Sequence, residues 1–214
     1  MQKYRRIDRR SYYLLLLILV PLFQLGDRII NKNYYQLDIQ IFQVIEQQRN
    51  FLLDFVFTNI YRITGTYFTG SVVLIALIIL IRQRYWQEVK ALIFATLGIL
   101  LLVDKILKPL FDRPRPPKPR LVFDLSPDSF PSGHAAGNLV FYFYLSFIIS
   151  ARYPSLTKYV YGLATILVLL IGSASIYTKA HWTTDILAGY SVGYFWLLIS
   201  LSLLKFLTNR KQLS

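Results

Sequence analysis

Long apolar stretches recur along the whole chain, and no other feature restricts its possible folds as strongly. Six of them are candidates for membrane-spanning helices: residues 11–26, 67–81, 91–107, 135–151, 159–176 and 186–204. Several are slightly shorter than the ~20 apolar residues that cross a bilayer, but a sequence defines the ends of helices least well. Hydrophobic residues make up 55% of the 214 residues, more than a water-soluble domain of this size could bury. The sequence therefore predicts an all-α, polytopic membrane protein with six transmembrane helices.

The segment between the first two of these stretches, residues 27–65, has a different pattern. Apolar residues such as Ile39, Phe42 and Ile45 recur at helical spacing, and charged residues lie between them. This spacing predicts one or two amphipathic helices that lie at the membrane surface. The segment could equally be a helical linker without a part in the chemistry. No repeat and no Gly/Ser-rich linker divides the chain, so we expect one domain over residues 1–214.

The basic residues are distributed so that they define an orientation in the membrane. With both termini placed inside, the basic N-terminal segment 1–10, the inner connections and the C-terminus together hold 13 basic and 2 acidic residues. The outer segments then hold the remaining 11 basic and 9 acidic residues. Because the inner segments of membrane proteins carry the excess of Lys and Arg, we expect both termini in the cytoplasm, and His134 and His181 on the opposite face.

The formal net charge of +13 could indicate a nucleic-acid partner. In a chain this apolar, however, topology-setting charges and anionic phospholipids are the better explanation. We therefore expect the lipid bilayer as a partner, and no nucleic acid. The chain has no cysteine, which excludes disulfide bonds and thiolate metal sites.

A cluster of basic residues lies on the predicted outer side, against the usual charge distribution. Its members are Lys105, Lys108, Arg113, Arg115, Lys118 and Arg120. Four prolines between residues 114 and 119 restrict the backbone there, so the charges are held with less entropy to lose. Arginine offers a planar fork that matches two phosphate oxygens. The cluster predicts an anionic ligand, although a solvated loop that contacts lipid headgroups is the simpler alternative.

The polar turn Pro131-Ser132-Gly133-His134 precedes the fourth apolar stretch. Ser132 can cap the following helix, and Gly133 lets the backbone approach a ligand closely. The free N–H groups of the first helical turn would then point at an anion, with His134 beside it. The alternative is a helix cap with an incidental interfacial histidine.

His181 and Asp185 are four residues apart at the start of the last apolar stretch, so both lie on one helical face. A carboxylate at this spacing can hold the imidazole in one tautomer and leave its other nitrogen free to attack. The pair could also serve only to stabilise the helix. With no third histidine and no cysteine to complete a typical zinc site, the residues favour phosphoryl transfer without a metal.

Taken together, these residues resemble the three motifs of the type 2 phosphatidic acid phosphatase family, the membrane-integral lipid phosphatases related to the vanadium haloperoxidases. The family's motifs are Lys-x6-Arg-Pro, Pro-Ser-Gly-His and Ser-Arg-x5-His-x3-Asp. They are matched here by Lys108 with Arg115-Pro116, by residues 131–134, and by His181 with Asp185. Order, spacing and the six-span layout agree over essentially the whole chain, so we expect the catalytic motifs within residues 108–185.

The resemblance implies a role for each of these residues. His181 would be the nucleophile that forms a phosphohistidine, Asp185 would orient its ring, and His134 would be the general acid and base. The phosphate would be held by Lys108, Arg115, Ser132 and Gly133. No metal and no other cofactor is expected.

The third motif departs from the family pattern at one position. Six residues before His181, where the family has a phosphate-binding arginine, this chain has Ser175. Loss of such a donor would cost about 2–4 kcal/mol of transition-state stabilisation. Lys179 and Arg113 are the two candidates to supply the missing charge, and we favour Lys179. Without such compensation the protein would be a weakened member that only binds lipid.

The expected function is therefore that of an integral-membrane lipid phosphatase at the outer face of a plasma membrane of the bacterial inner type. The substrate would be a phosphate monoester or diphosphate of a lipid: phosphatidylglycerophosphate, phosphatidate, undecaprenyl diphosphate or lipid A. The alternative enzyme is a lipid phosphotransferase that uses the same phosphohistidine.

Overall fold

This computed structural model describes residues 36–123 and 125–213 and, before them, residues 13, 17, 22, 24–27 and 29. The regular secondary structure of the described residues is helical; they contain no strand, only an isolated bridge between Pro114 and Asp128. The predicted all-α class is therefore confirmed. The predicted basic leader 1–10 and most of the predicted first span, 11–26, lie outside the described residues.

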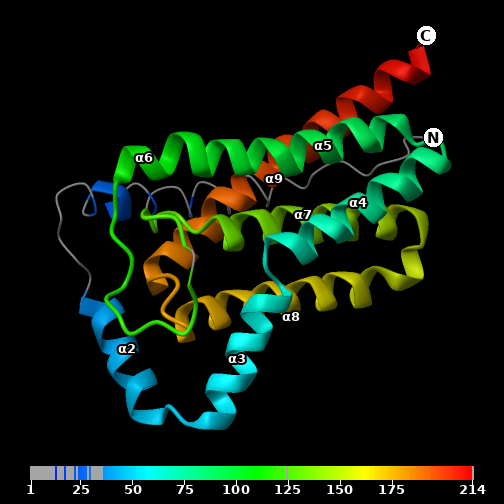
Figure 1. Ribbon diagram of the computed structural model, residues 1–214. Helices are drawn as coiled ribbons and strands as arrows, with labels where there is room; N and C mark the ends of the chain where they lie inside the picture. Colours follow the sequence, from blue (N-terminus) through cyan, green and yellow to red (C-terminus); the bar gives the residue numbers. More distant parts are fainter. Residues whose placement is uncertain are drawn as a thin grey trace.

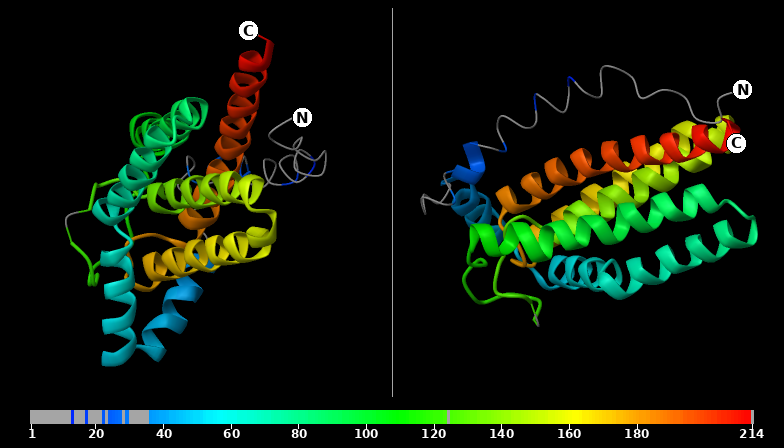
Figure 2. Two further views of the ribbon diagram at one scale, coloured as in Figure 1. Left: turned by 90° about the vertical axis from the view of Figure 1, so that its right-hand side faces the viewer. Right: turned by 90° about the horizontal axis from the view of Figure 1, so that it is seen from above.

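Long helices that lie side by side form the body of the molecule (Figure 1, Figure 2). They are α4 (Thr66–Arg82), α5 (Trp86–Leu101), α7 (Gly133–Arg152), α8 (Thr157–Tyr177) and α9 (Thr183–Leu213). Helices α4, α7, α8 and α9 each contain one of the apolar stretches expected from the sequence, and the stretch 91–107 begins in α5 and ends with the π-helix that follows it. Helix α5 continues through the π-helix η1 (Leu102–Leu107) into the short α6 (Lys108–Phe111), and the 3-10 turn η2 (Pro154–Leu156) leads into α8.

Four helical stretches of the described chain are long and apolar enough to cross a membrane: Phe51–Arg82, Gly133–Arg152, Pro154–Tyr177 and Thr183–Asn209. Large apolar side chains such as Leu74, Ile75 and Ile166 are exposed on the outside of these helices. Such a surface requires lipid rather than water around it, and the protein is an integral membrane protein. Helix α5 has only 16 residues before the π-helix begins, and the expected count of six spans is not confirmed.

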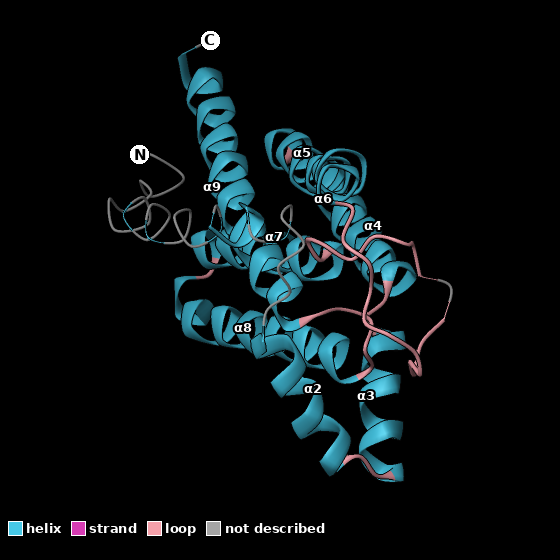
Figure 3. Cartoon of the chain, turned by 90° about the vertical axis from the view of Figure 1, so that its left-hand side faces the viewer, coloured by secondary structure: helices cyan, strands magenta, loops and turns pink. Residues whose placement is uncertain are grey.

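Helices α2 (Gln36–Gln48) and α3 (Phe51–Ile63) form a V that projects from one end of the body (Figure 1, Figure 3). Asn50 separates them, because its side chain accepts a hydrogen bond from the amide of Leu53 and so caps α3. The hairpin packs through α3 on α8 and through α2 on α9. The two helices agree with the helical pattern of residues 27–65, while their location at a membrane surface stays a prediction.

Small residues allow α9 to approach α7 closely. A Cβ atom on Gly189 would lie 2.6 Å from the backbone oxygen of Ser132, and one on Gly193 would lie 2.9 Å from that of Ala136. No side chain fits into either contact, so the two backbones touch. The first turns of α7 and α9, which carry the two histidine motifs, are brought together in this way.

The alternating directions of the helices separate two ends of the bundle. One end holds the starts of α7 and α9, the end of α8, and the loop that follows α6 (Figure 1). At the other end lie Arg82 and Arg152, the last residues of α4 and α7, together with Arg84 after α4 and Lys158 in the first turn of α8. The two histidines and these four basic residues thus lie at opposite ends of the bundle.

Candidate active site

The turn that begins α7 is tied directly to the first turn of α9. Ser132 caps α7, since its Oγ accepts a hydrogen bond from the amide of Ala135 at 3.3 Å. Its own backbone amide donates to the backbone oxygen of Asp185 at 3.0 Å. Together with the Gly189 contact, this hydrogen bond fixes His134, the second residue of α7, relative to α9.

His181 is held between a carboxylate and a guanidinium. Its Nδ1 lies 3.3 Å from Oδ2 of Asp185, and its Nε2 lies 3.3 Å from Nη1 of Arg115. Because an arginine nitrogen can only donate, Nε2 carries the lone pair and Nδ1 carries the proton. The side chain is almost fully buried. Burial lowers the pKa of His181, while the Asp185 carboxylate acts in the opposite direction, and the ring is therefore suited to act as a neutral nucleophile.

Arg115 is fixed by hydrogen bonds on every side of its planar group. It donates to the backbone oxygens of Ala180 at 2.6 Å and of Ser126 at 2.5 Å, and to Oγ of Ser126 at 3.0 Å. These bonds leave little freedom to a side chain whose charge is permanent. Burial lowers the pKa of Arg115 from its very high ordinary value.

Lys108 shares a hydrogen-bond partner with Arg115, since both side chains bond Oγ of Ser126. Its Nζ is 2.6 Å from Oδ1 of Asp104 and 3.5 Å from Oγ of Ser126. A Cβ atom on Gly133 would be 4.0 Å from the same Nζ, so the ammonium group faces the start of α7. Asp104 is on the π-helix, a type of distortion that is frequent at functional sites.

The histidines of the two motifs are neighbours. His134 is close enough to His181, Lys108 and Arg115 to interact with each of them electrostatically. The structure therefore brings most of the predicted site residues to one end of the bundle: Lys108, Arg115, Ser132, Gly133, His134, His181 and Asp185.

Asp38 is a further residue of this site, and sequence reasoning missed it. Its carboxylate accepts from the amide of Thr184 at 3.0 Å and from the Thr184 hydroxyl at 2.6 Å. It also accepts from Nη2 of Arg113 at 2.8 Å, while Nη1 of Arg113 donates to Asp185 at 2.5 Å. The only signal in the sequence is an acidic residue on a partly apolar helix, too common a pattern to single it out.

The two candidates for the missing motif arginine have other partners. Arg113 is fully buried and uses its guanidinium to join Asp38 to Asp185, with the Trp182 ring 5.2 Å below it. Lys179 extends towards α2, where its Nζ is 2.6 Å from Oε1 of Glu46. Both side chains thus hold the α2–α3 hairpin against the site, and their part in binding phosphate stays a prediction.

Ser175 itself has a structural task. Its Oγ donates to the backbone oxygen of Ile171 within α8, at 2.8 Å. Its backbone oxygen accepts from the amides of Ala180 and His181, at 3.0 and 3.2 Å. The residue therefore shapes the turn that presents His181, while its short side chain points back into its own helix.

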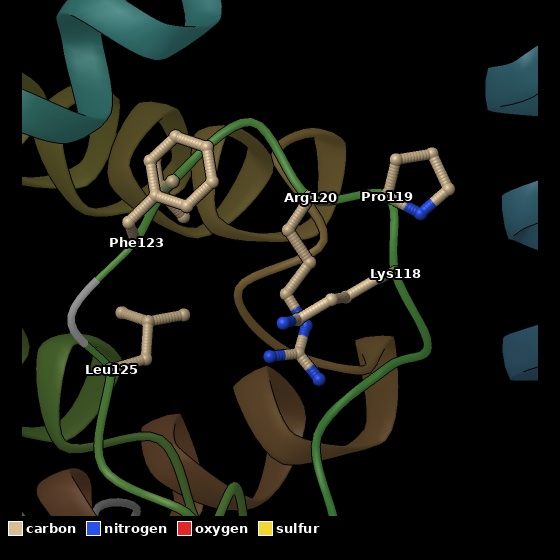
Figure 4. A pocket seen from close by; sticks show the side chains of 6 residues that line it. Lys118, Pro119, Arg120, Phe123 and Leu125 are labelled. Carbon is tan, nitrogen blue, oxygen red and sulfur yellow. The ribbon is translucent and has the colours of Figure 1, made fainter.

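A cavity of about 580 Å³ lies in the loop between α6 and α7 and is lined by Lys118, Pro119, Arg120, Val122, Phe123 and Leu125. In Figure 4 the side chains of Lys118 and Arg120 run towards one another, and Phe123 and Leu125 lie across from them. Leu125 is next to Ser126, the partner of both Lys108 and Arg115. A pocket with cationic and apolar sides is thus adjacent in the chain to the cluster around His181.

Part of the chain matches a known protein family. A family model described as the PAP2 superfamily matches residues 88–209. Phosphatidylglycerophosphatase B of Bacillus subtilis (strain 168) is 32% identical over 114 residues, which are 52% of this chain and 55% of that protein. The chain thus matches about half the length of this curated relative.

Two solved structures are similar over a larger part of the chain. The first transmembrane PAP2-type phosphatidylglycerolphosphate phosphatase from Bacillus subtilis superposes with a TM-score of 0.71 at 25% identity, over 86% of this chain and 94% of that one. LpxE from Aquifex aeolicus superposes with a TM-score of 0.61 at 29% identity, over 78% of this chain and 96% of that one.

Proposed function

Because this chain belongs to the PAP2 superfamily, we propose that it is a metal-independent lipid phosphatase that hydrolyses a phosphate monoester or diphosphate of a membrane lipid. The observation that carries the proposal is the arrangement around His181. One ring nitrogen faces Asp185, and the other carries a lone pair directed at the cationic group of Arg115. A phosphoryl group bound by Arg115 would therefore meet the nucleophilic nitrogen directly.

The residues divide the reaction into two steps. In the first, Nε2 of His181 attacks phosphorus in line, the bond from phosphorus to the lipid oxygen breaks, and His134 gives that oxygen a proton. In the second, His134 takes a proton from water, and the resulting hydroxide breaks the bond between phosphorus and His181 and releases inorganic phosphate. Asp185 stabilises the positive charge that the ring of His181 acquires during attack.

The charge that develops on the phosphoryl oxygens would be stabilised by donors that the fold holds in place. We assign this role to Lys108, Arg115, the hydroxyl of Ser132 and the amide of Gly133. All four belong to rigid elements: Arg115 is fixed by Ser126 and Ala180, and the other three lie on or beside helix starts and ends. Donors that need no reorganisation are the most effective in stabilising a transition state.

Phosphatidylglycerophosphate is the first substrate to test, since the Bacillus relative is named for it. Phosphatidate, undecaprenyl diphosphate and lipid A carry the same reacting group and remain candidates. The pocket with Lys118 and Arg120 suits the remainder of an anionic headgroup, and its apolar side formed by Phe123 and Leu125 suits the start of a lipid chain.

We also propose how the chain lies in the membrane. The stretch 11–26 and the continuous helix from α5 to α6 would complete six spans, with the α2–α3 hairpin at the surface. The termini would be cytoplasmic, and the site would face the outside of a plasma membrane of the bacterial inner type. Support comes from Arg82, Arg84, Arg152 and Lys158, which lie at the end of the bundle away from His181.

The test is a phosphate-release screen of the four lipids in detergent, with EDTA present and His181→Ala as the control. We expect turnover by the wild type in EDTA and none by the variant. An acid-labile, base-stable phosphoenzyme that forms from labelled substrate in the wild type alone would identify the phosphohistidine. Absence of phosphate release from every lipid would refute the proposal. Phosphate that appears on an added lipid acceptor instead of in solution would identify a phosphotransferase.

A further inference from the structure

Tyr61 has a buried hydroxyl group that is hydrogen-bonded to no other residue in the described part of the chain. The residue lies on α3 and is only 8% exposed, and its Oη has no partner among the described residues. Other tyrosines packed in this protein use their hydroxyls: Tyr144 donates to the backbone oxygen of Glu88 at 3.1 Å, and Tyr190 to that of Val168 at 2.7 Å. An unpaired buried hydroxyl destabilises the folded state, so a sequence that retains one requires an explanation.

The surroundings of Tyr61 provide that explanation. The centre of its ring is 5.4 Å from the centre of the His134 ring. It packs in one cluster with Val122, Ala174 and Ala180, and it lies close enough to Arg115 for the two side chains to interact electrostatically. Ala180 precedes His181 and accepts a hydrogen bond from Arg115. The unpaired hydroxyl therefore belongs to a side chain that borders the catalytic groups on several sides.

Tyr61 also lies near Ser175, the position at which the third motif departs from the family pattern. Where the family pattern has an arginine, the side chain of Ser175 is short and donates to Ile171 within its own helix. Tyr61 belongs to the same buried cluster as Ala174, the residue directly before Ser175, and Ala180, which follows it in the chain. An aromatic side chain from α3 is thus clustered with residues on both sides of position 175 in the chain.

Resting on the proposed phosphatase function, we propose that Tyr61 is a phosphate ligand whose hydroxyl donates a hydrogen bond to a non-bridging oxygen of the substrate's phosphoryl group. It supplies a donor from α3 in place of the one that Ser175 lacks. His181 is 1% exposed and Tyr61 is 8% exposed, and His134 lies beside both of them. A phosphoryl group that reaches Nε2 of His181 would therefore come close to the Tyr61 hydroxyl. A neutral phenol can donate to an anion there without the cost of burying another charge.

Tyr61→Phe removes the hydroxyl and leaves the ring, and Tyr144→Phe is the matched control because its hydroxyl is bonded far from the site. Three quantities are measured in detergent: the thermal unfolding midpoint, kcat/KM on phosphatidylglycerophosphate, and the Kd of orthovanadate by calorimetry. For Tyr61→Phe we expect an unchanged or raised midpoint, and a loss of about 10- to 100-fold in kcat/KM and vanadate affinity, as for a hydrogen bond to a charged group. For Tyr144→Phe we expect a lowered midpoint with both functional quantities unchanged.

The outcomes separate this proposal from the proposed function. If the wild type hydrolyses the lipid and Tyr61→Phe matches it in kcat/KM and vanadate affinity, Tyr61 is not a ligand, although the phosphatase assignment stands. If the wild type hydrolyses no lipid phosphate, the phosphatase assignment fails. The orthovanadate Kd alone then decides whether Tyr61 is an oxyanion ligand. Weaker binding by Tyr61→Phe then supports Tyr61 as an oxyanion ligand, and equal binding, or none by the wild type, overturns it. A lowered midpoint with unchanged vanadate affinity would assign Tyr61 to packing alone.

Discussion

Nη1 of Arg115 lies 3.3 Å from Nε2 of His181, on the side of the ring opposite to Asp185. One imidazole is therefore in contact with a cation and an anion at once, each at a different nitrogen. The cation requires a lone pair on Nε2, and the anion requires the proton on Nδ1. The pair Arg115–His181 thus sets the tautomer of the nucleophile and marks the position of the phosphate that it would attack.

The fork shape of Arg115 should matter more than its charge. We expect Arg115→Lys to lose about 100-fold or more in kcat/KM, because one ammonium group cannot bond Ala180, Ser126 and a phosphate oxygen together. Steady-state phosphate release measures the effect. The control is Arg152→Lys, at the other end of the bundle over the Tyr85 ring, which should behave as the wild type. Near-normal activity of Arg115→Lys would show that the positive charge is sufficient and that the fork shape is not required.

The pH profile of kcat/KM should show the burial of His181. Its neutral form attacks, and burial lowers its pKa below the ordinary value of about 6.5, so the acidic limb should lie below pH ~6.5. Asp185 favours the protonated form, and Asp185→Asn should therefore move the limb to still lower pH while it lowers the plateau by roughly 10²- to 10⁴-fold. The substrate titrates identically in both profiles, so the shift isolates His181. A limb that moves to higher pH in the variant would contradict the arrangement.

Asp38 should act on the reaction without contact to the substrate. Asp38→Asn leaves the buried guanidinium of Arg113 with one carboxylate fewer, which we expect to lower the free energy of unfolding by about 3–5 kcal/mol. Displacement of Asp185 should also lower kcat by about 10- to 100-fold. Glu46→Gln, on the exposed side of the same helix, is the control and should change neither quantity appreciably. Denaturation in mixed detergent micelles measures the loss of stability, and kcat is measured at denaturant concentrations below the unfolding midpoint. A stable, fully active Asp38→Asn variant would show that Asp38 does not act on the reaction.

The ion pair of Lys179 with Glu46 leads us to expect a minor role in catalysis, which is the opposite of the phosphate-binding role that the sequence favoured, and one measurement decides between the two. Its ammonium group pairs with Glu46, a half-exposed carboxylate whose pKa the hydrogen bond from Lys179 lowers. Such pairs contribute about 0–1 kcal/mol, so Lys179→Ala should lose no more than about fivefold in kcat/KM. Lys108→Ala serves for comparison and should lose about 100-fold or more. Equal losses in the two variants would show that Lys179 reaches the phosphate during turnover.

Gly189 should tolerate no side chain. Its Cβ would lie 2.6 Å from the backbone oxygen of Ser132, so Gly189→Ala must push α9 away from the start of α7. We expect a loss of about 1–3 kcal/mol in stability together with a fall in kcat. Gly162→Ala is the matched control on α8: nothing lies within 4 Å of its Cβ, and alanine should stabilise the helix by up to about 1 kcal/mol. A Gly189→Ala variant with wild-type stability and kcat would show that the contact is not required.

The parts of this structure that the sequence predicted correctly depend on local patterns. Apolar stretches predicted α4, α5, α7, α8 and α9, since the length and composition of a stretch decide whether it suits a bilayer. The three motifs predicted which side chains would meet, because each motif has a fixed spacing at the start or end of a helix. His181 and Asp185 share one face simply by being four residues apart.

The parts that the sequence did not predict depend on distant contacts. Asp38 reaches Thr184 across 146 residues, and nothing in the pattern around either residue indicates the other. The sequence also did not predict the ion pair of Lys179 with Glu46: the backbone of Lys179 has a left-handed φ of 56°, and its side chain extends to α2. Its part in binding phosphate stays a prediction. Proximity in the chain does not determine the direction of a side chain at a turn.

The V of α2 and α3 lies wholly before residue 88, where the family match begins. Asp38 on one arm is coupled to Arg113, and Tyr61 on the other arm is packed beside Ser175's neighbours. A chimera that exchanged this hairpin for that of another relative would therefore retain all three motifs and still mismatch its own catalytic end. Each arm of the hairpin therefore has to match the bundle residue near it. Among relatives, residue 38 should vary together with residue 113, and residue 61 together with residue 175.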